Sequence, residues 1–450
     1  MEEYDLVILG GGPGGYVTAE RAGKEKMRVL VVEKDQLGGV CLNAGCIPTK
    51  TLLNAAKIYK NAKSSATLGV SVEGARFDLA RAMAWKEQVV EGLRKGIAFQ
   101  MKRYGVEVVT GHGAIADPRT VTVTDASGGS RSYRGRSLIV ATGSSPLRLR
   151  VPGADKPHVV DSTGILRLTS APRSLAIIGG GVIGMEFACF FAAIGVKVTV
   201  IEMMPEIIPV IDPELARTLR TSLPEITFEL GATVTEITDR GVRFTRGQEA
   251  REVEADLVLV AVSRKPNVEG NGFEAVGLDF DRAGIRVDGS MRTNLPAVYA
   301  AGDVTGKHLY AHAASRMGEI ALNGIRGRND RLRTAAIPWV VYTFPEIAGV
   351  GPTEAEALAQ GRKVKTAQVQ MRANGRFVAE NEKGRGVCKV VVDAESGALL
   401  GVHLIGAYAS EIVGAATAMV EAELRVNDIR DLVLPHPTVS ELVREAVWEL

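Results

Sequence analysis

Apolar residues gather in short runs separated by glycine-rich turns, and one such pattern occurs twice along the chain. Residues 4–33 begin with the apolar run Tyr4–Leu9, continue through a glycine-rich turn and a helix-length segment, and end with a second apolar run and Glu33. Residues 174–202 repeat this order and end at Glu202. Strand-like runs that alternate with helix-length segments are typical of β-α-β units in a parallel sheet. We therefore predict two such units.

Each turn has the spacing G-x-G-x-x-G. The first glycine permits a tight turn, the second lets the backbone approach a pyrophosphate, and the third lets helix and strand pack closely. The helix N-terminus offers free N–H groups to phosphate, and an acid at the end of the second strand can bind ribose hydroxyls. One such motif can be an ordinary glycine-rich turn, but two complete copies indicate a protein that binds two dinucleotides. The residues concerned are Gly10, Gly12, Gly15 and Glu33 in the first copy, and Gly179, Gly181, Gly184 and Glu202 in the second.

Further runs extend this architecture. Leu138–Ser144 and Val298–Asp303 each predict a buried strand that ends in a turn, and Asp303 either reaches a cofactor hydroxyl or is an ordinary turn residue. The remaining predicted elements are helices over Thr49–Lys63, Asp78–Tyr104 and Ser410–Ala422, and strands over Asp256–Val262, Gly386–Val392 and Leu399–Ile405. From Ile337 onward the pattern changes to strands followed by amphipathic helices, which indicates a separate α+β domain. The predicted fold class is therefore α/β, with two Rossmann-like dinucleotide-binding domains and a C-terminal α+β domain.

Composition narrows the class of protein. The 54 basic and 52 acidic residues nearly cancel, which does not support a nucleic-acid footprint. No apolar run reaches the ~18 residues of a membrane span. A strand beginning at Tyr4 leaves no room for a signal or transit peptide. Four cysteines in 450 residues do not make a secreted disulfide scaffold. We therefore expect a cytoplasmic protein.

Two cysteines lie close together in residues 38–50, GGVCLNAGCIPTK. Cys41 and Cys46 are five residues apart, a step that rises ~7.5 Å on an unbroken helix and is too long for a disulfide. A bond between them needs a distorted turn, for which Gly45 supplies backbone freedom. Pro48 favours a helix start that places Cys46 near the N-terminus, where a thiolate is stabilised. The alternative is two unrelated buried thiols.

A metal site is not expected, because about three or four ligands are needed and no His lies near these cysteines in the sequence. Cys189 and Cys388 lie within apolar helix and strand patterns. We predict that both are core thiols.

Together with the motifs ATG at 141–143, GGGVIGMEF at 179–187, AAGD at 300–303 and HPTVSE at 436–441, this cysteine segment resembles the flavoprotein disulfide reductases. The choices Leu42-Asn43 and Ile47-Pro48-Thr49-Lys50 are most similar to the dihydrolipoamide dehydrogenase branch. The resemblance covers nearly the whole chain. It implies an FAD-binding domain over residues 1–145, an NAD-binding domain over 146–270, a segment completing the FAD site over 271–336, and a dimerisation domain over 337–450.

The resemblance also assigns roles. Cys41 and Cys46 form a redox-active disulfide, in which Cys46 exchanges electrons with the flavin and Cys41 meets a dithiol substrate. Lys50, on its spacing alone a solvated helix lysine, approaches the flavin and pairs with Glu186. The remaining residues implied for FAD are Lys34, Gly39, Gly113, Thr142, Gly143, Asp303, Ala311 and His312, and those for NAD are Val182, Ile183, Val234 and the turn Val262–Pro266, with Val262 and Arg264.

His436 and Glu441 are implied to be a catalytic base and its orienting carboxylate, with His436 supplied by the opposite subunit of a dimer. Histidine suits a proton shuttle near neutral pH. Glu441 has a second interpretation, because Thr438-x-x-Glu441 is the pattern of a capping box that opens a helix over Val439–Trp448. The two roles are compatible.

The implied activity is oxidation of dihydrolipoamide, with electrons passing through the disulfide and FAD to NAD⁺. The implied partners are a second copy of the chain and a lipoyl-bearing acyltransferase or glycine cleavage lipoyl protein, with no nucleic acid or membrane. The alternatives are another disulfide reductase, such as a glutathione or mercuric reductase, and a non-catalytic scaffold. The sequence has no C-terminal cysteine pair, which argues against the mercuric branch. The chain departs from the family pattern at Ser263, Ala313, Phe344 and Leu434-Pro435.

Overall fold

The first β-α-β unit forms the centre of a mainly parallel sheet. The computed structural model describes residues 2–381 and 384–450. Strand β1 (Glu2–Leu9) lies between β2 (Val29–Glu33) and β6 (Ser130–Val140), with β3 (Glu107–Thr110) beyond β2, and helix α1 (Pro13–Lys24) connects β1 to β2. The predicted unit over residues 4–33 is therefore confirmed.

Strand β6 joins two kinds of pairing. Residues 130–134 pair antiparallel with β5 (Thr120–Thr124), which in turn pairs with β4 (His112–Asp117). Residues 133–140 pair in parallel with β1, and residues 138–140 also pair in parallel with β19 (Val298–Ala300). A strand from far along the chain thus completes this sheet, and the turn after it lies next to the turn after β6. The two predicted strands that end in turns, Leu138–Ser144 and Val298–Asp303, are neighbours in space.

The second unit builds another parallel sheet in the order β11-β10-β9-β15-β8. Alternate residues of β9 face opposite ways, as a strand requires: Ile177 packs towards α5 and Ile178 towards a three-stranded antiparallel sheet. The bounds are β8 (Val159–Val160), β9 (Ser174–Ile178), α5 (Val182–Ala193), β10 (Lys197–Glu202), α6 (Pro213–Thr221), β11 (Ile226–Leu230), β12 (Ala232–Ile237), β13 (Gly241–Arg246), β14 (Glu249–Glu254) and β15 (Leu257–Val260). Strand β15 is shorter than the predicted run Asp256–Val262.

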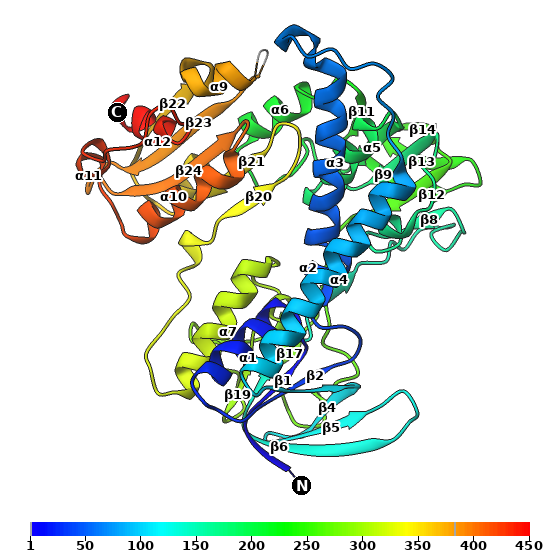
Figure 1. The fold of residues 1–450 in the computed structure, drawn as a ribbon, viewed down its shortest axis with the longest axis vertical. Coiled ribbons are helices and arrows are strands. Elements are labelled where there is room, and N and C mark those ends of the chain that lie inside the picture. Colours follow the sequence, from blue (N-terminus) through cyan, green and yellow to red (C-terminus); the bar gives the residue numbers. More distant parts are fainter. Residues whose placement is uncertain (1, 382–383) are drawn as a thin grey trace.

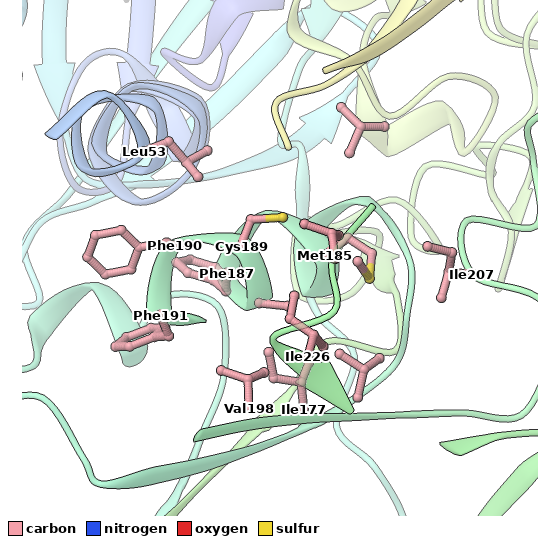
Figure 2. Close-up of a cluster of buried hydrophobic side chains, with 14 of the residues drawn as sticks. Leu53, Ile177, Met185, Phe187, Cys189, Phe190, Phe191, Val198, Ile207 and Ile226 are labelled. Carbon is pink, nitrogen blue, oxygen red and sulfur yellow. The ribbon is translucent and has the colours of Figure 1, made fainter. Parts of the chain in front are cut away.

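Helix α5 is buried along most of its length because other elements cover it on both sides. In Figure 2, Leu53 of α3 (Cys46–Ser64) lies across from Phe187, Cys189 and Phe190 of α5, while Ile177, Val198 and Ile226 of the sheet lie on the other side. Cys189 is 2% exposed, and burial raises the pKa of its thiol to about 12. It is a core thiol, as predicted.

The two long helices join the units. Helix α3 packs against α5 and against α4 (Leu79–Arg103). The bounds of α3 and α4 agree within three residues with the helices predicted over Thr49–Lys63 and Asp78–Tyr104. Asp78, the residue before α4, accepts a hydrogen bond from the N–H of Arg81 at 3.0 Å and so caps the helix. Figure 1 shows α3 and α4 running between the first and second sheets.

The C-terminal part is an antiparallel sheet in the order β20-β21-β24-β23-β22, with α10 and α12 packed on it. Cys388 of β23 is fully buried, as predicted, and burial raises the pKa of its thiol to about 12. The bounds are β20 (Trp339–Val341), β21 (Ile347–Val350), α8 (Glu354–Ala359), β22 (Val364–Gln370), α9 (Gly375–Glu380), β23 (Val387–Asp393), β24 (Leu399–Ile405), α10 (Ala409–Glu421), α11 (Val426–Arg430) and α12 (Glu441–Trp448). The α+β character predicted from Ile337 onward is observed.

The remaining elements complete the described part of the chain. They are α2 (Gly39–Ala44), β7 (Ser144–Pro146), β16 (Arg264–Pro266), β17 (Phe280–Asp281), β18 (Gly284–Ile285), α7 (Ala311–Ile325) and 3-10 turns at Ser65–Leu68, Ile165–Arg167, Asp303–Thr305, Thr334–Ala336 and Met371–Ala373. Residues Arg264–Pro266, expected as part of a turn, instead form β16, which pairs with β7. Among the helices described, none has the length and apolar character needed to cross a membrane.

Candidate active site

The first glycine turn has the open side that a pyrophosphate requires. Gly10 has φ +106°, and a Cβ there would overlap the carbonyl oxygen of Ala141, while a Cβ on Gly15 would overlap the carbonyl oxygen of Gly10. A Cβ on Gly12, by contrast, would meet only the Cα of Gly39, at 3.7 Å. Helix α1 begins there with no side-chain cap and no acid in its first turn. Its free N–H groups fit a phosphate group.

The second turn repeats this arrangement. Gly179 has φ +107°, and a Cβ on Gly184 would overlap the carbonyl oxygen of Gly179. A Cβ on Gly181 would have nothing within 4 Å, and helix α5 begins at Val182 and Ile183 without a side-chain cap. We call each glycine turn together with the uncapped helix start that follows it a cradle. The first cradle spans residues 10–15 and the second spans residues 179–184, and each is suited to one dinucleotide.

An acid is fixed beside each cradle. Glu33 accepts hydrogen bonds from the N–H groups of Gly11 at 2.6 Å and Asp35 at 2.9 Å. Glu202 accepts them from Gly180 at 2.6 Å and Met204 at 2.8 Å. A carboxylate has about four acceptor sites, so each acid keeps capacity for ribose hydroxyls. Lys34, which follows Glu33, is exposed.

Cys41 and Cys46 form a disulfide, with their Cα atoms 4.6 Å apart. Gly45 ends α2 and precedes α3, with φ −151° and ψ −109°, so the helix is broken between the two cysteines. Cys46 is the first residue of α3, and Pro48 lies in its first turn. The distorted turn and the helix N-terminus expected from the sequence are both present.

Two backbone contacts place this disulfide beside the first cradle. The N–H of Gly38 donates to the carbonyl of Gly11 at 2.8 Å. Gly39 has φ +58°, and a Cβ there would meet the Cα of Gly12 at 2.6 Å. Glycine at position 39 lets the cysteine segment come this close to Gly12.

Lys50 is not a solvated helix lysine. Its ammonium group lies 2.7 Å and 2.9 Å from the two carboxylate oxygens of Glu186, a side chain that is 5% exposed. Tyr342, directly after β20, holds the same pair: its N–H donates to Glu186 at 3.1 Å, and its ring lies 4.7 Å from the ammonium of Lys50. The expected pair therefore exists, and all three parts of the fold meet at it.

Asp303 is tied to the turn after β6. Ser144 donates a hydrogen bond to Asp303 at 2.5 Å, and Arg264 donates to the hydroxyl and carbonyl of Ser144 at 2.7 Å and 2.6 Å. Burial lowers the pKa of Arg264. Thr142 donates to the carbonyl of Asn267 at 2.9 Å. Arg264, expected at the NAD site, thus contacts the turn that carries Thr142 and Gly143, on the side expected for FAD.

Helices α7 and α1 lie side by side in a parallel register. A Cβ on Gly14 would meet the carbonyl oxygen of Ala314 at 3.3 Å, and one on Gly318 would overlap the hydroxyl of Thr18. Ala311 opens α7 without a side-chain cap, so two uncapped helix N-termini face the same region. His312 bonds through Nε2 to the carbonyl of Pro338 at 2.8 Å, and burial lowers its pKa.

The other implied residues are packed positions near the two cradles. Gly113 of β4 is buried, and a Cβ there would meet Leu9 at 2.7 Å. Val234 and Val262 pack against the same buried cluster under the second sheet.

His436 lies apart from the disulfide of its own chain. Its Nδ1 is 2.9 Å from one oxygen of Glu441, whose other oxygen accepts the N–H of Thr438 at 2.9 Å. The hydrogen bond from the N–H of Thr438, and after it the hydrogen bond with His436, hold the pKa of Glu441 below its usual value. The side chain of His436 is 80% exposed. Figure 1 shows α12 at the edge of the molecule, well away from α2.

The predicted capping box is wrong in form. The helix begins at Glu441 rather than at Val439, and Ser440 precedes it without a side-chain cap. Thr438 donates its hydroxyl to the carbonyl of Pro435 at 2.8 Å instead of accepting from the helix. Only half of the box exists, because residues 439–440 form a turn that sets Glu441 back towards His436.

Sequence reasoning missed Tyr342 and Ser144. Ser144 directly follows the ATG motif, a position that could have drawn attention to it. Tyr342 carries no local signal, since its contacts come from helices almost 300 and 160 residues earlier. Within the described ranges, no three His, Cys, Asp or Glu side chains come together as a possible metal site.

Comparison with known proteins agrees with this geometry. Residues 4–318 match the pyridine nucleotide-disulphide oxidoreductase family, and residues 337–447 match its dimerisation domain. The chain belongs to this family. The dimerisation domain supports a homodimer.

Relatives match over nearly the full length of the chain. Dihydrolipoyl dehydrogenase 3 of Pseudomonas putida is 38% identical, covering 100% of this chain and 98% of the relative, and a dihydrolipoyl dehydrogenase of Bacillus subtilis is 37% identical, covering 99% and 96%. Among solved structures, LpdA from Mycobacterium tuberculosis has a TM-score of 0.91 at 27% identity, covering 100% of this chain and 99% of that one. The HOCl-induced flavoprotein disulfide reductase RclA from Escherichia coli, as its Cu(II) complex, has a TM-score of 0.88 at 28% identity, covering 100% of both.

Proposed function

We propose that this protein oxidises dihydrolipoamide to lipoamide and delivers the electrons to NAD⁺. The observation that carries the proposal is the Cys41–Cys46 disulfide held beside the first of two dinucleotide cradles. Similarity to dihydrolipoyl dehydrogenases over the full chain supports the dithiol as the substrate. The protein is an oxidoreductase with FAD and NAD(H) as its cofactors.

The residues present fit these two groups. The uncapped N-termini of α1 and α7, Glu33 and Asp303 would hold FAD, while the cradle at Gly181 and Glu202 would hold NAD. When bound, FAD accepts an electron pair from a dithiol and returns it to NAD⁺ as hydride. The protein supplies the disulfide, the positions of charged groups and the proton acceptor.

Disulfide exchange accounts for the reduction of the protein. A substrate thiolate attacks the sulfur of Cys41, the Cys41–Cys46 bond breaks, and Cys46 leaves as a thiolate. The second substrate thiolate then attacks the mixed disulfide, which releases cyclic lipoamide and leaves Cys41 reduced. Cys46 opens α3, where the helix N-terminus stabilises a thiolate. Two protons leave the substrate in this exchange: His436 is the proposed acceptor of one, and the other remains on the thiol of Cys41.

Glu441 orients that acceptor. Its hydrogen bond to Nδ1 leaves Nε2 of His436 free to take a proton. Since His436 is far from its own disulfide, we propose that it serves the disulfide of the second subunit. Lys50 and Glu186 provide a fixed charge pair beside the first turn of α3.

The finer assignments extend this proposal. The lipoyl group would be carried by an acyltransferase of a 2-oxoacid dehydrogenase complex or by the lipoyl protein of glycine cleavage, in the cytoplasm. Domain boundaries at 145, 270 and 336 are part of the same proposal, with residues 271–336 returning to the first sheet through β19.

A substrate panel tests the function. Purified, FAD-loaded protein is assayed for oxidation of dihydrolipoamide with either NAD⁺ or NADP⁺. It is also assayed for reduction of glutathione disulfide and of Hg²⁺ with NADH or NADPH as the electron donor. We expect dihydrolipoamide with NAD⁺ to give the highest kcat/KM, because Glu202 would repel a 2′-phosphate and no arginine follows it at Met203 and Met204. Preferred turnover of glutathione disulfide or Hg²⁺ would contradict the proposal, and a preference for NADP⁺ would contradict the role of Glu202.

A further inference from the structure

A buried ion pair joins the second dinucleotide unit to the C-terminal sheet. The ammonium of Lys389, on β23, lies 2.9 Å from a carboxylate oxygen of Asp212, and the two side chains are 12% and 8% exposed. Glu354 lies 3.2 Å from the same ammonium. Two residues 177 positions apart are thus held together where water is largely excluded.

Asp212 uses its two oxygens differently. One accepts from Lys389, and the other accepts the N–H of Glu214 at 2.9 Å and caps α6. Burial opposes ionisation of Asp212, but the hydrogen bonds from Lys389 and Glu214 outweigh it and keep its pKa below the usual value. For Lys389, burial is likewise outweighed by Asp212 and Glu354, and its pKa is raised. Both partners are therefore charged at neutral pH.

The loop before Asp212 reaches back to the second cradle. The N–H of Ile211 donates to the carbonyl of Ile208 at 3.1 Å, and the N–H of Ile208 donates to the carbonyl of Gly180 at 2.9 Å. The N–H of Gly180 in turn donates to Glu202 at 2.6 Å. A continuous set of contacts thus runs from Lys389 to the middle of the G-x-G-x-x-G turn.

Ile208 shows that this loop is held under constraint. It has φ +47°, in the left-handed region, although a β-branched side chain disfavours that conformation. Its side chain is 1% exposed and packs in the core around α5. Strain of this kind persists only where surrounding contacts enforce it, and it is common at ligand sites. The hydrogen bond to Gly180 and the anchor at Asp212 are such contacts.

We propose that Lys389 and Asp212 are positioning residues for NAD: from outside the cradle, they clamp residues 203–212 so that Gly180 and Glu202 keep the geometry that receives the adenosine half. This inference rests on the proposed assignment of NAD to the second cradle. It gives the C-terminal domain a part in cofactor binding that is separate from dimer formation and from His436.

Variants separate this clamp from general stability. Lys389→Met removes the charge, Asp212→Asn keeps an oxygen to cap α6 but loses the charge, and Lys389→Arg keeps the charge. Lys363→Met is the matched control, since Lys363 lies in the same domain and makes an exposed ion pair with Glu395, with side chains 79% and 72% exposed. The measurements are the Kd of NADH by fluorescence, FAD content, and the rate at which dihydrolipoamide reduces the enzyme without NAD⁺.

We expect Lys389→Met and Asp212→Asn each to raise the Kd of NADH by about tenfold, with FAD content and reduction by dihydrolipoamide unchanged. Lys389→Arg should restore most of the affinity, and Lys363→Met should match the wild type. The double variant Lys389→Met/Asp212→Asn should have a Kd for NADH no higher than that of the single variant that binds NADH more weakly, because the two side chains act through one contact.

An unchanged Kd for NADH in folded Lys389→Met and Asp212→Asn would overturn the inference, as would equal loss of NADH binding and of reduction by dihydrolipoamide. If Lys389→Met does not fold, Lys389→Met/Asp212→Asn, which removes the contact without leaving the charge of Asp212 buried and unpaired, takes its place, and the same rise of about tenfold in the Kd of NADH is expected. Failure of the wild-type protein to bind NADH would instead contradict the proposed function.

Discussion

The two oxygens of Glu441 connect the local fold to the proposed proton acceptor. One oxygen fixes the chain at Thr438, and the other fixes the imidazole of His436. Because the pKa of Glu441 lies below the usual value, its carboxylate stays charged at neutral pH. In the proposed reaction, this fixed carboxylate would favour the imidazolium form of His436.

His436→Gln should therefore lower dihydrolipoamide oxidation by ~10²-fold or more, the usual contribution of a positioned base. Oxidation of NADH by an artificial acceptor that takes electrons directly from the flavin needs no such base and should change far less. Glu441→Gln should be milder, because the amide oxygen can still accept from Thr438 or His436. Equal loss of both activities in folded, FAD-loaded His436→Gln would indicate a structural role instead.

The two cysteines should give opposite spectra. After reduction by dihydrolipoamide, a Cys46 thiolate next to oxidised flavin should produce a long-wavelength absorption band. Cys46→Ser should lose the band while retaining FAD, whereas Cys41→Ser keeps a thiolate at 46 and should show the band without reduction. Absorption spectra at equal FAD content measure this, and the reverse pattern would exchange the roles of the two sulfurs.

Within each cradle, the glycines act for different physical reasons. Gly184 must be glycine for packing, since a Cβ would overlap the carbonyl of Gly179, whereas Gly181 faces open space with nothing within 4 Å. The same spacing therefore combines a requirement of the fold with a requirement of the ligand. Substitution by alanine can separate them.

Gly181→Ala should fold with a melting temperature near that of the wild type but bind NADH at least about tenfold more weakly, as expected when a hydrogen bond to a charged phosphate worth ~1.5–3 kcal/mol is lost. Gly184→Ala should lower the free energy of unfolding by about 1–3 kcal/mol, the usual cost of overpacking. Thermal unfolding and NADH titration of both variants test this. A destabilised Gly181→Ala with normal NADH affinity would show that its open side is not the pyrophosphate site.

What could be predicted from the sequence follows from the range of each interaction. The cradles, the broken helix at Gly45 and the core thiols depend on residues close in sequence, and their spacing predicted them. The pairing of β7 with β16, the contact of Tyr342 with Lys50, and the Lys389–Asp212 pair join segments more than 100 residues apart. No local pattern marks such contacts. The hydrogen bonds from Arg264 to Ser144 are a further example, since Arg264 follows the second unit in sequence and Ser144 follows the last strand of the first.

At the scale of the whole molecule, each subunit is incomplete for the proposed reaction. The disulfide joins α2 to the first residue of α3, whereas His436, with its side chain 80% exposed, precedes α12, which lies at the edge of the molecule and away from α2 in Figure 1. Val433, three residues before His436, is 97% exposed. A two-fold dimer solves this problem if each site takes its cysteines from one chain and its histidine from the other. Residues 337–447 match a dimerisation domain, which agrees with that arrangement.

Mixed dimers test this arrangement directly. In a heterodimer of one Cys41→Ser chain and one His436→Gln chain, one site would carry both lesions and the other would carry none, so dihydrolipoamide oxidation should be roughly half that of the wild-type dimer. Each variant alone, as a homodimer, should have at most ~1% of wild-type activity, since both of its sites carry a lesion. Coexpression with two different tags, followed by sequential affinity purification, isolates the heterodimer. Activity no higher than the mean of the two homodimers would place the histidine and the cysteines of each site on the same chain.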